Sequence, residues 1–224
     1  MDILAVGAHI GDAELMCGPL LVEEIGKGNS ATILALTPGE MGSSDQSSTE
    51  YKRQKLIENK IFCEKIGVSS IVFEDCRDGF LLANDEIAFR IARLIREFRP
   101  RTILGHWEGS FHPDHRNAHA LVKRAVFLAA LPLDGEEHSP HESKLKFSEN
   151  WEDMVGFEVT EYQDISDDAF RIWSEAILTH AFARGETKGF RYIDYYTALM
   201  TARGCLSNSR RAVALMEDPF AVTI

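Results

Sequence analysis

The chain has 224 residues, of which 45% are hydrophobic, and its 24 lysines and arginines stand against 35 aspartates and glutamates, for a formal net charge of −11. This length and hydrophobic content suit one globular domain of enzyme size and exclude a disordered, collagen-like or coiled-coil chain. The acidic balance argues against nucleic acid or an anionic membrane as a partner.

No apolar run approaches the ~20 residues of a membrane helix, and the first residues lack the basic segment of a signal peptide. We therefore expect a cytoplasmic protein without a membrane span. The cysteines are widely spaced and form no Cys-x-x-Cys pair, so free thiols are expected rather than a disulfide framework or a zinc ribbon.

Strand and helix patterns alternate through the first 130 residues. The predicted strands are short, buried apolar runs bounded by turn residues: 3–7, 31–36, 70–73 and 102–105. The predicted helices follow them and several end at glycine or proline: 20–27, 51–66, 85–98 and 112–129. This order predicts an α/β fold with a Rossmann-like open, mostly parallel sheet and helices on both faces.

The last third of the chain is less regular. Residues 145–147 and 156–159 have strand patterns, and residues 167–182 and 192–203 have helical patterns. No repeat or linker divides the chain. We expect a single domain over residues 1–224, in which 1–130 form the parallel core and 131–224 form an irregular extension that caps or extends the sheet.

Two short motifs place polar side chains directly after predicted strands. His9 and Asp12 lie in Gly-Ala-His-Ile-Gly-Asp-Ala-Glu after the run 3–7, and His115 ends Phe-His-Pro-Asp-His after the run 102–105. Sites form at the carboxyl edge of open parallel sheets, so we expect these side chains to converge. Two imidazoles and a carboxylate are the ligands of a hydrolytic zinc site that keeps a position open for water. The sequence therefore predicts a Zn²⁺ site.

The two histidines of the second motif are expected to differ in role, because Pro113 stiffens the turn between them. One would bind the metal, and the other, held as an imidazolium by a carboxylate such as Asp114, would stabilise an oxyanion and protonate a leaving amine. The alternative is structural, since an aspartate that opens a helix is commonly an N-cap. For the other histidines we expect structural roles: His106, His119, His138, His141 and His180.

Together the two motifs resemble the LmbE-like (PIG-L) family of zinc-dependent deacetylases, which remove acetyl groups from substrates that contain N-acetylglucosamine. The family's Ala-His-Pro-Asp-Asp corresponds to residues 8–12, and its His-Pro-Asp-His corresponds to residues 112–115. The similarity covers at least residues 2–130 and implies the LmbE-like fold. Family members often form trimers or hexamers, which leaves a homo-oligomer open.

The resemblance assigns metal and catalytic roles. The metal ligands fall on His9, Asp12 and His115, the electrophilic histidine falls on His112, and its supporting carboxylate falls on Asp114.

The resemblance also assigns three substrate-binding positions. They fall on Glu40 in Thr-Pro-Gly-Glu, on Lys55 where the family has an arginine, and on Asp78 in an Asp-Gly turn. A lysine is a point charge and does not replace the bidentate fork of an arginine.

Gly11 departs from the family pattern. It stands where the family has the aspartate that takes a proton from the metal-bound water, and loss of such a base typically costs ~10²- to 10⁴-fold in rate. Glu40, Asp45 and Glu108 are candidate replacements from other loops, whereas Glu14 is expected to be structural. Gly11 and its neighbour Ile10 are expected to leave a roomier, less polar site.

We therefore expect a zinc-dependent hydrolase that removes an acyl group from a small-molecule amino sugar or glycoside. The alternative is a protein of the same fold that binds metal and sugar but has lost or altered catalysis because of Gly11. A nucleotide-binding domain is a third hypothesis, but the first loop lacks the Gly-x-Gly-x-x-Gly run that such domains use.

Overall fold

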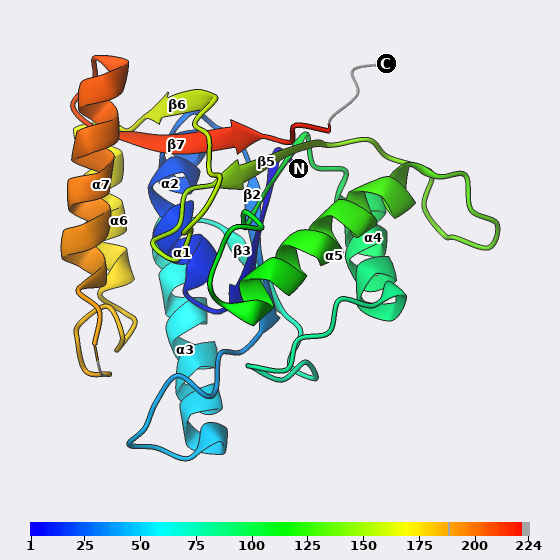
Figure 1. The fold of residues 1–224 in the computed structure, drawn as a ribbon, viewed down its shortest axis with the longest axis horizontal. Helices are drawn as coiled ribbons and strands as arrows, with labels where there is room; N and C mark the ends of the chain where they lie inside the picture. The colour runs from blue at the N-terminus through cyan, green and yellow to red at the C-terminus, as the bar shows by residue number, and fades with distance from the viewer. Residues whose placement is uncertain (188, 221–224) are drawn as a thin grey trace.

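The computed structural model describes residues 1–187 and 189–220, and its strands form one sheet in the order β3-β2-β1-β4-β5-β7-β6 (Figure 1). The strands are β1 (Ile3–His9), β2 (Ala31–Thr37), β3 (Ser69–Val72), β4 (Thr102–Gly105), β5 (Lys144–Ser148), β6 (Glu161–Asp164) and β7 (Ala212–Glu217). Strands β1 to β5 pair in parallel, and β7 pairs antiparallel with β5 and β6. The predicted α/β class and the mostly parallel sheet are confirmed.

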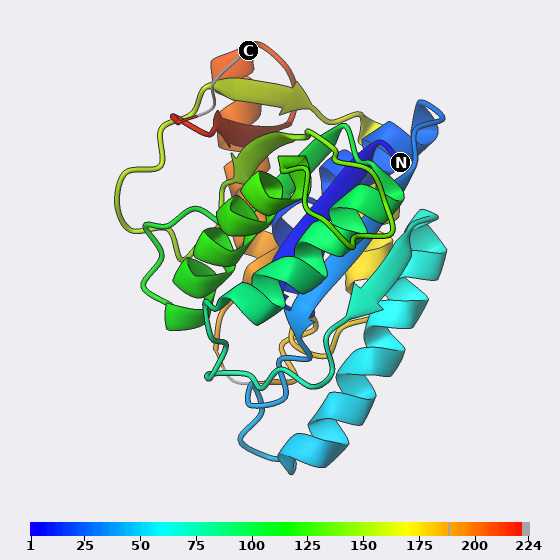
Figure 2. The ribbon, with the colours of Figure 1, turned by 90° about the vertical axis from the view of Figure 1, so that its right-hand side faces the viewer.

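Helices cover both faces of the sheet, as Figures 1 and 2 show. One face carries α4 (Asp85–Phe98) and α5 (Pro113–Ala130). The other carries α1 (Asp12–Met16), α2 (Gly18–Gly26), α3 (Ser48–Ile66), α6 (Asp167–Ile177) and α7 (Tyr192–Ser207). Local chemistry fixes several helix starts: Ser47 and Glu50 form a capping box at α3, and Pro113 takes the first turn of α5 behind His112.

The structure corrects two predictions in the C-terminal third. Residues 156–159 are not a strand, because Gly156 has a positive φ of 73° and the extended edge strand begins only at Glu161. The helix predicted over 167–182 ends at Ile177, and the turns that follow carry His180 and Phe182 inward. Strand β7 was not predicted, although it joins the extension to the main sheet.

The helix predicted over 20–27 is α2, and a short helix that was not predicted, α1, precedes it and meets it at Cys17. Close packing from α6 accompanies this break. A Cβ on Gly18 would lie 2.7 Å from the indole of Trp173, and the Trp173 Nε1 donates a hydrogen bond of 2.8 Å to the Glu14 carbonyl. Asp12 begins the first of these short helices, directly after β1.

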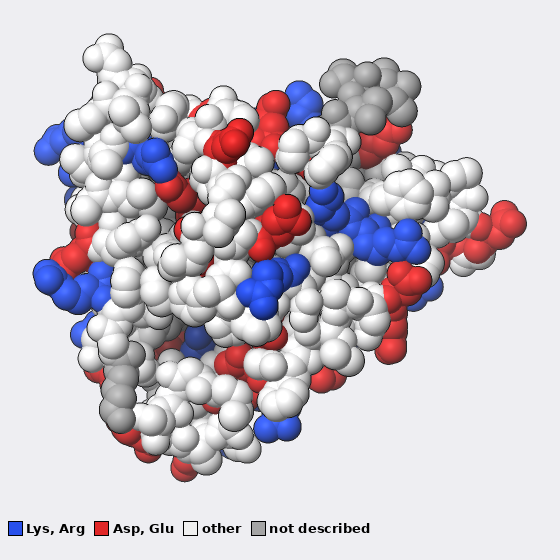
Figure 3. Space-filling model, viewed as in Figure 1, with Lys and Arg blue, Asp and Glu red and all other residues white. Residues whose placement is uncertain are grey.

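On the face shown in Figure 3, acidic and basic side chains alternate among the residues that the structure describes. Among residues 1–187 and 189–220, no helix combines the length and apolar character needed to cross a membrane.

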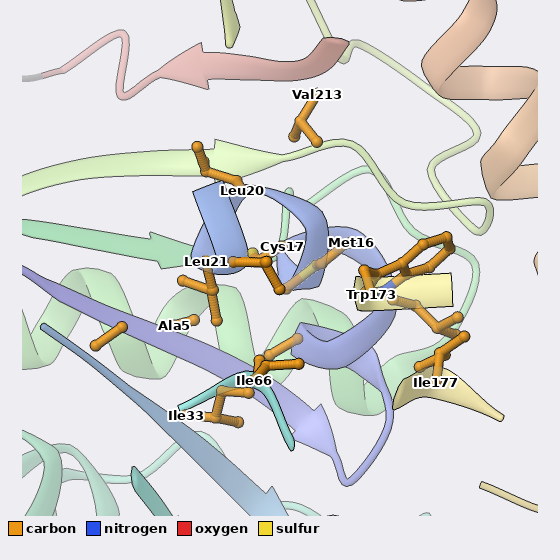
Figure 4. Close-up of a cluster of buried hydrophobic side chains, with 14 of the residues drawn as sticks. Ala5, Met16, Cys17, Leu20, Leu21, Ile33, Ile66, Trp173, Ile177 and Val213 are labelled. Carbon is orange, nitrogen blue, oxygen red and sulfur yellow. The ribbon is translucent and has the colours of Figure 1, made fainter. Parts of the chain in front are cut away.

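The core lies in two layers, one on each face of the sheet. Figure 4 shows part of the layer under α1, α2 and α6, a single buried cluster to which the fully buried Leu21, Ile33, Trp173 and Ile177 belong. Burial of such side chains stabilises the fold by roughly 1.5–3 kcal/mol each. The loops at the carboxyl ends of the strands start from this buried core.

Candidate active site

A cavity of about 200 Å³ opens at the carboxyl edge of the sheet. Its polar lining comes from loops and helices far apart in the chain: His9, Asp12, Lys55, Asp78, His112, His115, Asn150 and Glu152. Its apolar lining includes Tyr51, Trp151, Phe182, Tyr192 and Tyr196. Both the first 130 residues and the C-terminal extension therefore build the walls.

The three predicted metal ligands converge in this cavity. Asp12 Oδ2 lies 3.2 Å from His9 Nδ1 and 3.3 Å from His115 Nε2. One donor atom from each residue lies within 4.8 Å of the others. His9 ends β1, Asp12 begins α1, and His115 lies in the first turn of α5. Two imidazole nitrogens and a carboxylate facing a cavity fit a hydrolytic divalent metal.

A second group of possible donors shares His9 and adds His112 and Asp114. Asp114 does not line the cavity, and its carboxylate accepts hydrogen bonds from the Gly79 N–H at 2.7 Å and the Leu81 N–H at 3.3 Å. A catalytic metal needs a position open to substrate. The group of His9, Asp12 and His115 meets that requirement better.

Carboxylates also face the outer nitrogens of both histidine donors. His9 Nε2 lies 3.0 Å from Asp78 and 3.2 Å from Asp114, and His115 Nδ1 lies 2.9 Å from Glu152. Such partners fix the tautomer and the ring orientation of a metal-binding histidine. Each ring can therefore point its inner nitrogen at the shared site.

The carboxylates dominate the electrostatics of these rings. Burial alone would lower the pKa of His115, but Asp12 and Glu152 outweigh it and raise the pKa to about 9. Burial would likewise lower the pKa of His9, but Asp12, Asp114 and Asp78 raise it well above its usual value.

His112 differs from the other two histidines. Its Nδ1 accepts a hydrogen bond of 3.2 Å from the Asp114 backbone N–H, so the ring caps α5 and its Nε2 holds the proton of the neutral form. The Asp114 carboxylate contacts His9 instead. Burial, with the charges of His9 and His115, lowers the pKa of His112. The expected pairing of His112 with the Asp114 carboxylate is thus replaced by a backbone contact.

The expectation of a roomier site at Gly11 is wrong. A Cβ at Gly11 would lie 2.7 Å from two ring atoms of Phe182, which fill the space that a side chain would need. His180 stacks on Phe182 with 5.0 Å between ring centroids. Gly11 also has φ of 111°, a backbone conformation that suits glycine. Gly11 and Phe182 therefore form a packed pair, and a less polar site stays a prediction.

The candidate replacement bases do not line the cavity. Glu40 accepts a hydrogen bond of 3.1 Å from the Asp78 N–H, Asp45 accepts one of 2.8 Å from Ser44, and Glu108 lies 3.7 Å from His119. Besides Asp12, the carboxylates that line the cavity among the described residues are Asp78 and Glu152.

The three predicted substrate-binding residues lie in different settings. Lys55 and Asp78 line the cavity. Asp78 also accepts a hydrogen bond of 2.9 Å from the Met41 N–H, and Lys55 donates to the Ile10 carbonyl. Glu40 does not line the cavity, and its carboxylate accepts a hydrogen bond from the backbone N–H of Asp78. Substrate contact by each of the three stays a prediction.

The sequence analysis missed three residues of the site. His106 is fully buried, accepts a hydrogen bond of 3.0 Å from the Ala8 N–H and lies 3.3 Å from Asp12. Burial, with the charge of His115, lowers its pKa to about 4. Its position directly after β4 was the available signal. Glu152 follows β5 at the same edge of the sheet, and its place in the site could be predicted only from the pairing of β4 with β5. No pattern in the sequence indicated that Phe182 belongs to the site.

Fold and site together define a Rossmann-like α/β protein with a candidate metal centre at the carboxyl edge of its sheet. The profile of the PIG-L family (GlcNAc-PI de-N-acetylase) matches residues 4–126, and the chain belongs to that family. The matched part contains all the predicted metal and catalytic residues.

Named relatives agree with this placement. The chain is 28% identical to the diacetylchitobiose deacetylase of Thermococcus kodakarensis, over 86% of this chain and 80% of that one. It is 30% identical to the 1D-myo-inositol 2-acetamido-2-deoxy-alpha-D-glucopyranoside deacetylase of Thermomonospora curvata over 60% of this chain, and this match spans about half (55%) of that relative.

The fold also resembles a solved structure with a different named reaction. GalB, the 4-carboxy-2-hydroxymuconate hydratase of Pseudomonas putida KT2440, superposes with a TM-score of 0.87 at 21% identity, over 100% of this chain and 99% of that one. This likeness concerns the fold alone.

Proposed function

We propose that the protein is a zinc-dependent hydrolase that removes an acyl group from an amino sugar or a related small glycoside. The observation that carries this proposal is the convergence of His9, Asp12 and His115 on one cavity, with carboxylates behind both rings. Family membership and the two deacetylase relatives support the reaction class.

We assign metal binding to three residues and proton transfer to a fourth. His9, Asp12 and His115 would hold the metal, which supplies Lewis-acid polarisation of the amide and a more acidic water. His112 lines the cavity with its Nδ1 occupied, so its Nε2 is the atom that can donate to the oxyanion and pass a proton to the leaving amine.

Asp114 and Glu152 keep the inner nitrogens of His9 and His115 directed at the site. We further propose that residues 1–224 act as one domain, because both parts of the chain wall the cavity. The cytoplasmic location and a homo-oligomeric state stay predictions.

Acetate release and metal content together test the proposal. The zinc-loaded protein should hold one metal ion and release acetate from some members of a panel of N-acetylglucosaminides. His115→Ala should lose both, whereas His138→Ala, which removes an exposed histidine far from the cavity, should keep both. Full metal content in His115→Ala would contradict the ligand assignment, and no acetate from any substrate would contradict the reaction.

A second candidate is a protein of the same fold that binds metal and a small molecule but has lost or altered the hydrolysis. The packed pair of Gly11 and Phe182 favours it, because the position of the family's base is closed. GalB, named a hydratase, illustrates a different reaction named on this fold. Ligand-induced thermal stabilisation without acetate release would support this candidate.

A further inference from the structure

Lys55 is a buried cation with an unusual set of neighbours. It lies on α3, its exposed fraction is 6%, and it lines the cavity. Its Nζ donates one hydrogen bond to the Ile10 carbonyl. Its other close neighbours are ring faces, with Nζ 4.9 Å from the centroid of Phe182 and 5.8 Å from that of Tyr51.

In the described part of the chain, no carboxylate forms an ion pair with Lys55. Burial lowers the pKa of Lys55, and four carboxylates that form no ion pair with it offset only part of this effect: Asp12, Glu14, Asp78 and Glu58. An ammonium has three donors, so two remain after the bond to the Ile10 carbonyl. Removal of a charge from water is costly unless a partner compensates for it.

The cavity supplies no other side chain of this kind. Among its described lining residues, Lys55 is the only lysine or arginine. Phe182 fills the space beside Gly11, and Lys55 lines the remaining cavity that a ligand would enter. A ligand that carries an anion would supply the missing partner.

We propose that Lys55 binds a carboxylate of the substrate, so that the preferred amino sugar is an acidic one. This inference rests on the proposed function for the sugar, but the carboxylate preference concerns binding and does not require hydrolysis. The metal can also attract a carboxylate, and the test must separate these two cations.

The probe is a matched pair of ligands, N-acetylglucosamine and N-acetylglucosaminuronic acid, which differ in one CH₂OH replaced by a carboxylate. Calorimetric titration of the zinc-loaded protein should give at least ~10-fold tighter binding of the acid, in line with couplings of close charge pairs. Lys55→Met should remove this preference, and Lys55→Arg should keep most of it. Lys52→Met changes a lysine of the same helix that does not line the cavity, and it should match the wild type.

Equal binding of the two ligands by the wild type, or no binding of either, would overturn the inference. A preference for the acid that survives in Lys55→Met would also overturn it, because the metal would then be the partner. The acid preference without acetate release would support the inference while the proposed hydrolysis fails. Acetate release from the neutral sugar, with no preference for the acid in binding, would support the proposed hydrolysis and overturn the inference about Lys55.

Discussion

The cavity has two walls that treat polar groups in opposite ways. On the metal wall, which is formed by His9, Asp12 and His115, Asp12 lies within 3.3 Å of both histidines, and carboxylates lie behind the two rings. On the opposite wall, Gly11 and Phe182 place an apolar ring where the family has a carboxylate. The candidate metal donors are therefore all present in this chain, whereas the position that the resemblance assigns to the base carries no side chain.

The two walls also differ in what a substitution would disturb. The donors of the metal wall come from strand ends and helix starts, which the buried sheet fixes in place. Phe182 lies in turns after α6 and is held by stacking on His180 and by the nearby Lys55. Changes on the metal wall should alter metal binding, whereas changes on the other wall should alter the reaction or the choice of substrate.

The largest effect is expected for Asp12→Asn. Asp12 is the donor that contacts both histidines, and its amide replacement keeps the shape but loses the charge that a divalent metal requires. Metal content measured after dialysis should fall from one ion per chain to near zero, and acetate release should fall with it. Retained metal in Asp12→Asn would contradict the assignment of Asp12 as a metal donor, and the contrast between the two walls would then be lost.

A smaller effect on the same wall is expected for Glu152→Gln. The variant weakens the contact of 2.9 Å with His115 Nδ1 but leaves all three donors in place. Loss of such a partner typically costs ~10–100-fold in metal affinity. Competition with a zinc chelator measures it, with Glu158→Gln, an exposed glutamate of the same loop, as the control. Equal affinity in the two variants would show that Glu152 does not orient His115.

On the opposite wall, Gly11→Asp alone should destabilise the fold by about 1–3 kcal/mol, because the side chain would overlap Phe182 and φ is positive. Denaturant titration measures this change. Gly11→Asp combined with Phe182→Ala relieves the overlap and should release acetate faster than either single variant. If Gly11→Asp alone is as stable as the wild type, the packed pair does not block a base at this position.

The smallest effect is a pH dependence of the metal-free protein. The pKa of His115 is raised to about 9 from its usual 6.5 by Asp12 and Glu152 against the effect of burial. Its contribution to stability is therefore present below pH 6.5 and is lost as the pH rises through about 9. The unfolding midpoint in chelator should fall over this range more in the wild type than in His115→Gln. Parallel profiles would show that His115 is not stabilised by the metal wall.

Local patterns predicted the parallel half of the molecule well, because each buried strand and amphipathic helix there carries its own signal. The predicted helix 85–98 and strand 102–105 agree with α4 and β4 to the residue. The C-terminal extension depends on pairing across the sheet, which local patterns do not encode. That is why β7 was missed and residues 156–159 were wrongly predicted as a strand.

The site divides in the same way. His9, Asp12 and His115 were predictable because their loops leave strands at one edge of the sheet. Phe182 was not, because its approach to Gly11 depends on how the turns after α6 fold back over the cavity. The sequence showed that a carboxylate was absent at position 11, but only the packing showed that the space is filled.

The family profile ends at residue 126, yet Trp151, Glu152, Phe182 and Tyr192 all line the cavity. The cavity is thus walled by two halves of the chain, a first half with the candidate metal donors and a second half with mostly aromatic side chains. Mutations in the second half can change the molecules that enter while the donors of the first half stay intact. We expect substitutions of these aromatic side chains to change the choice of substrate without loss of the candidate metal donors.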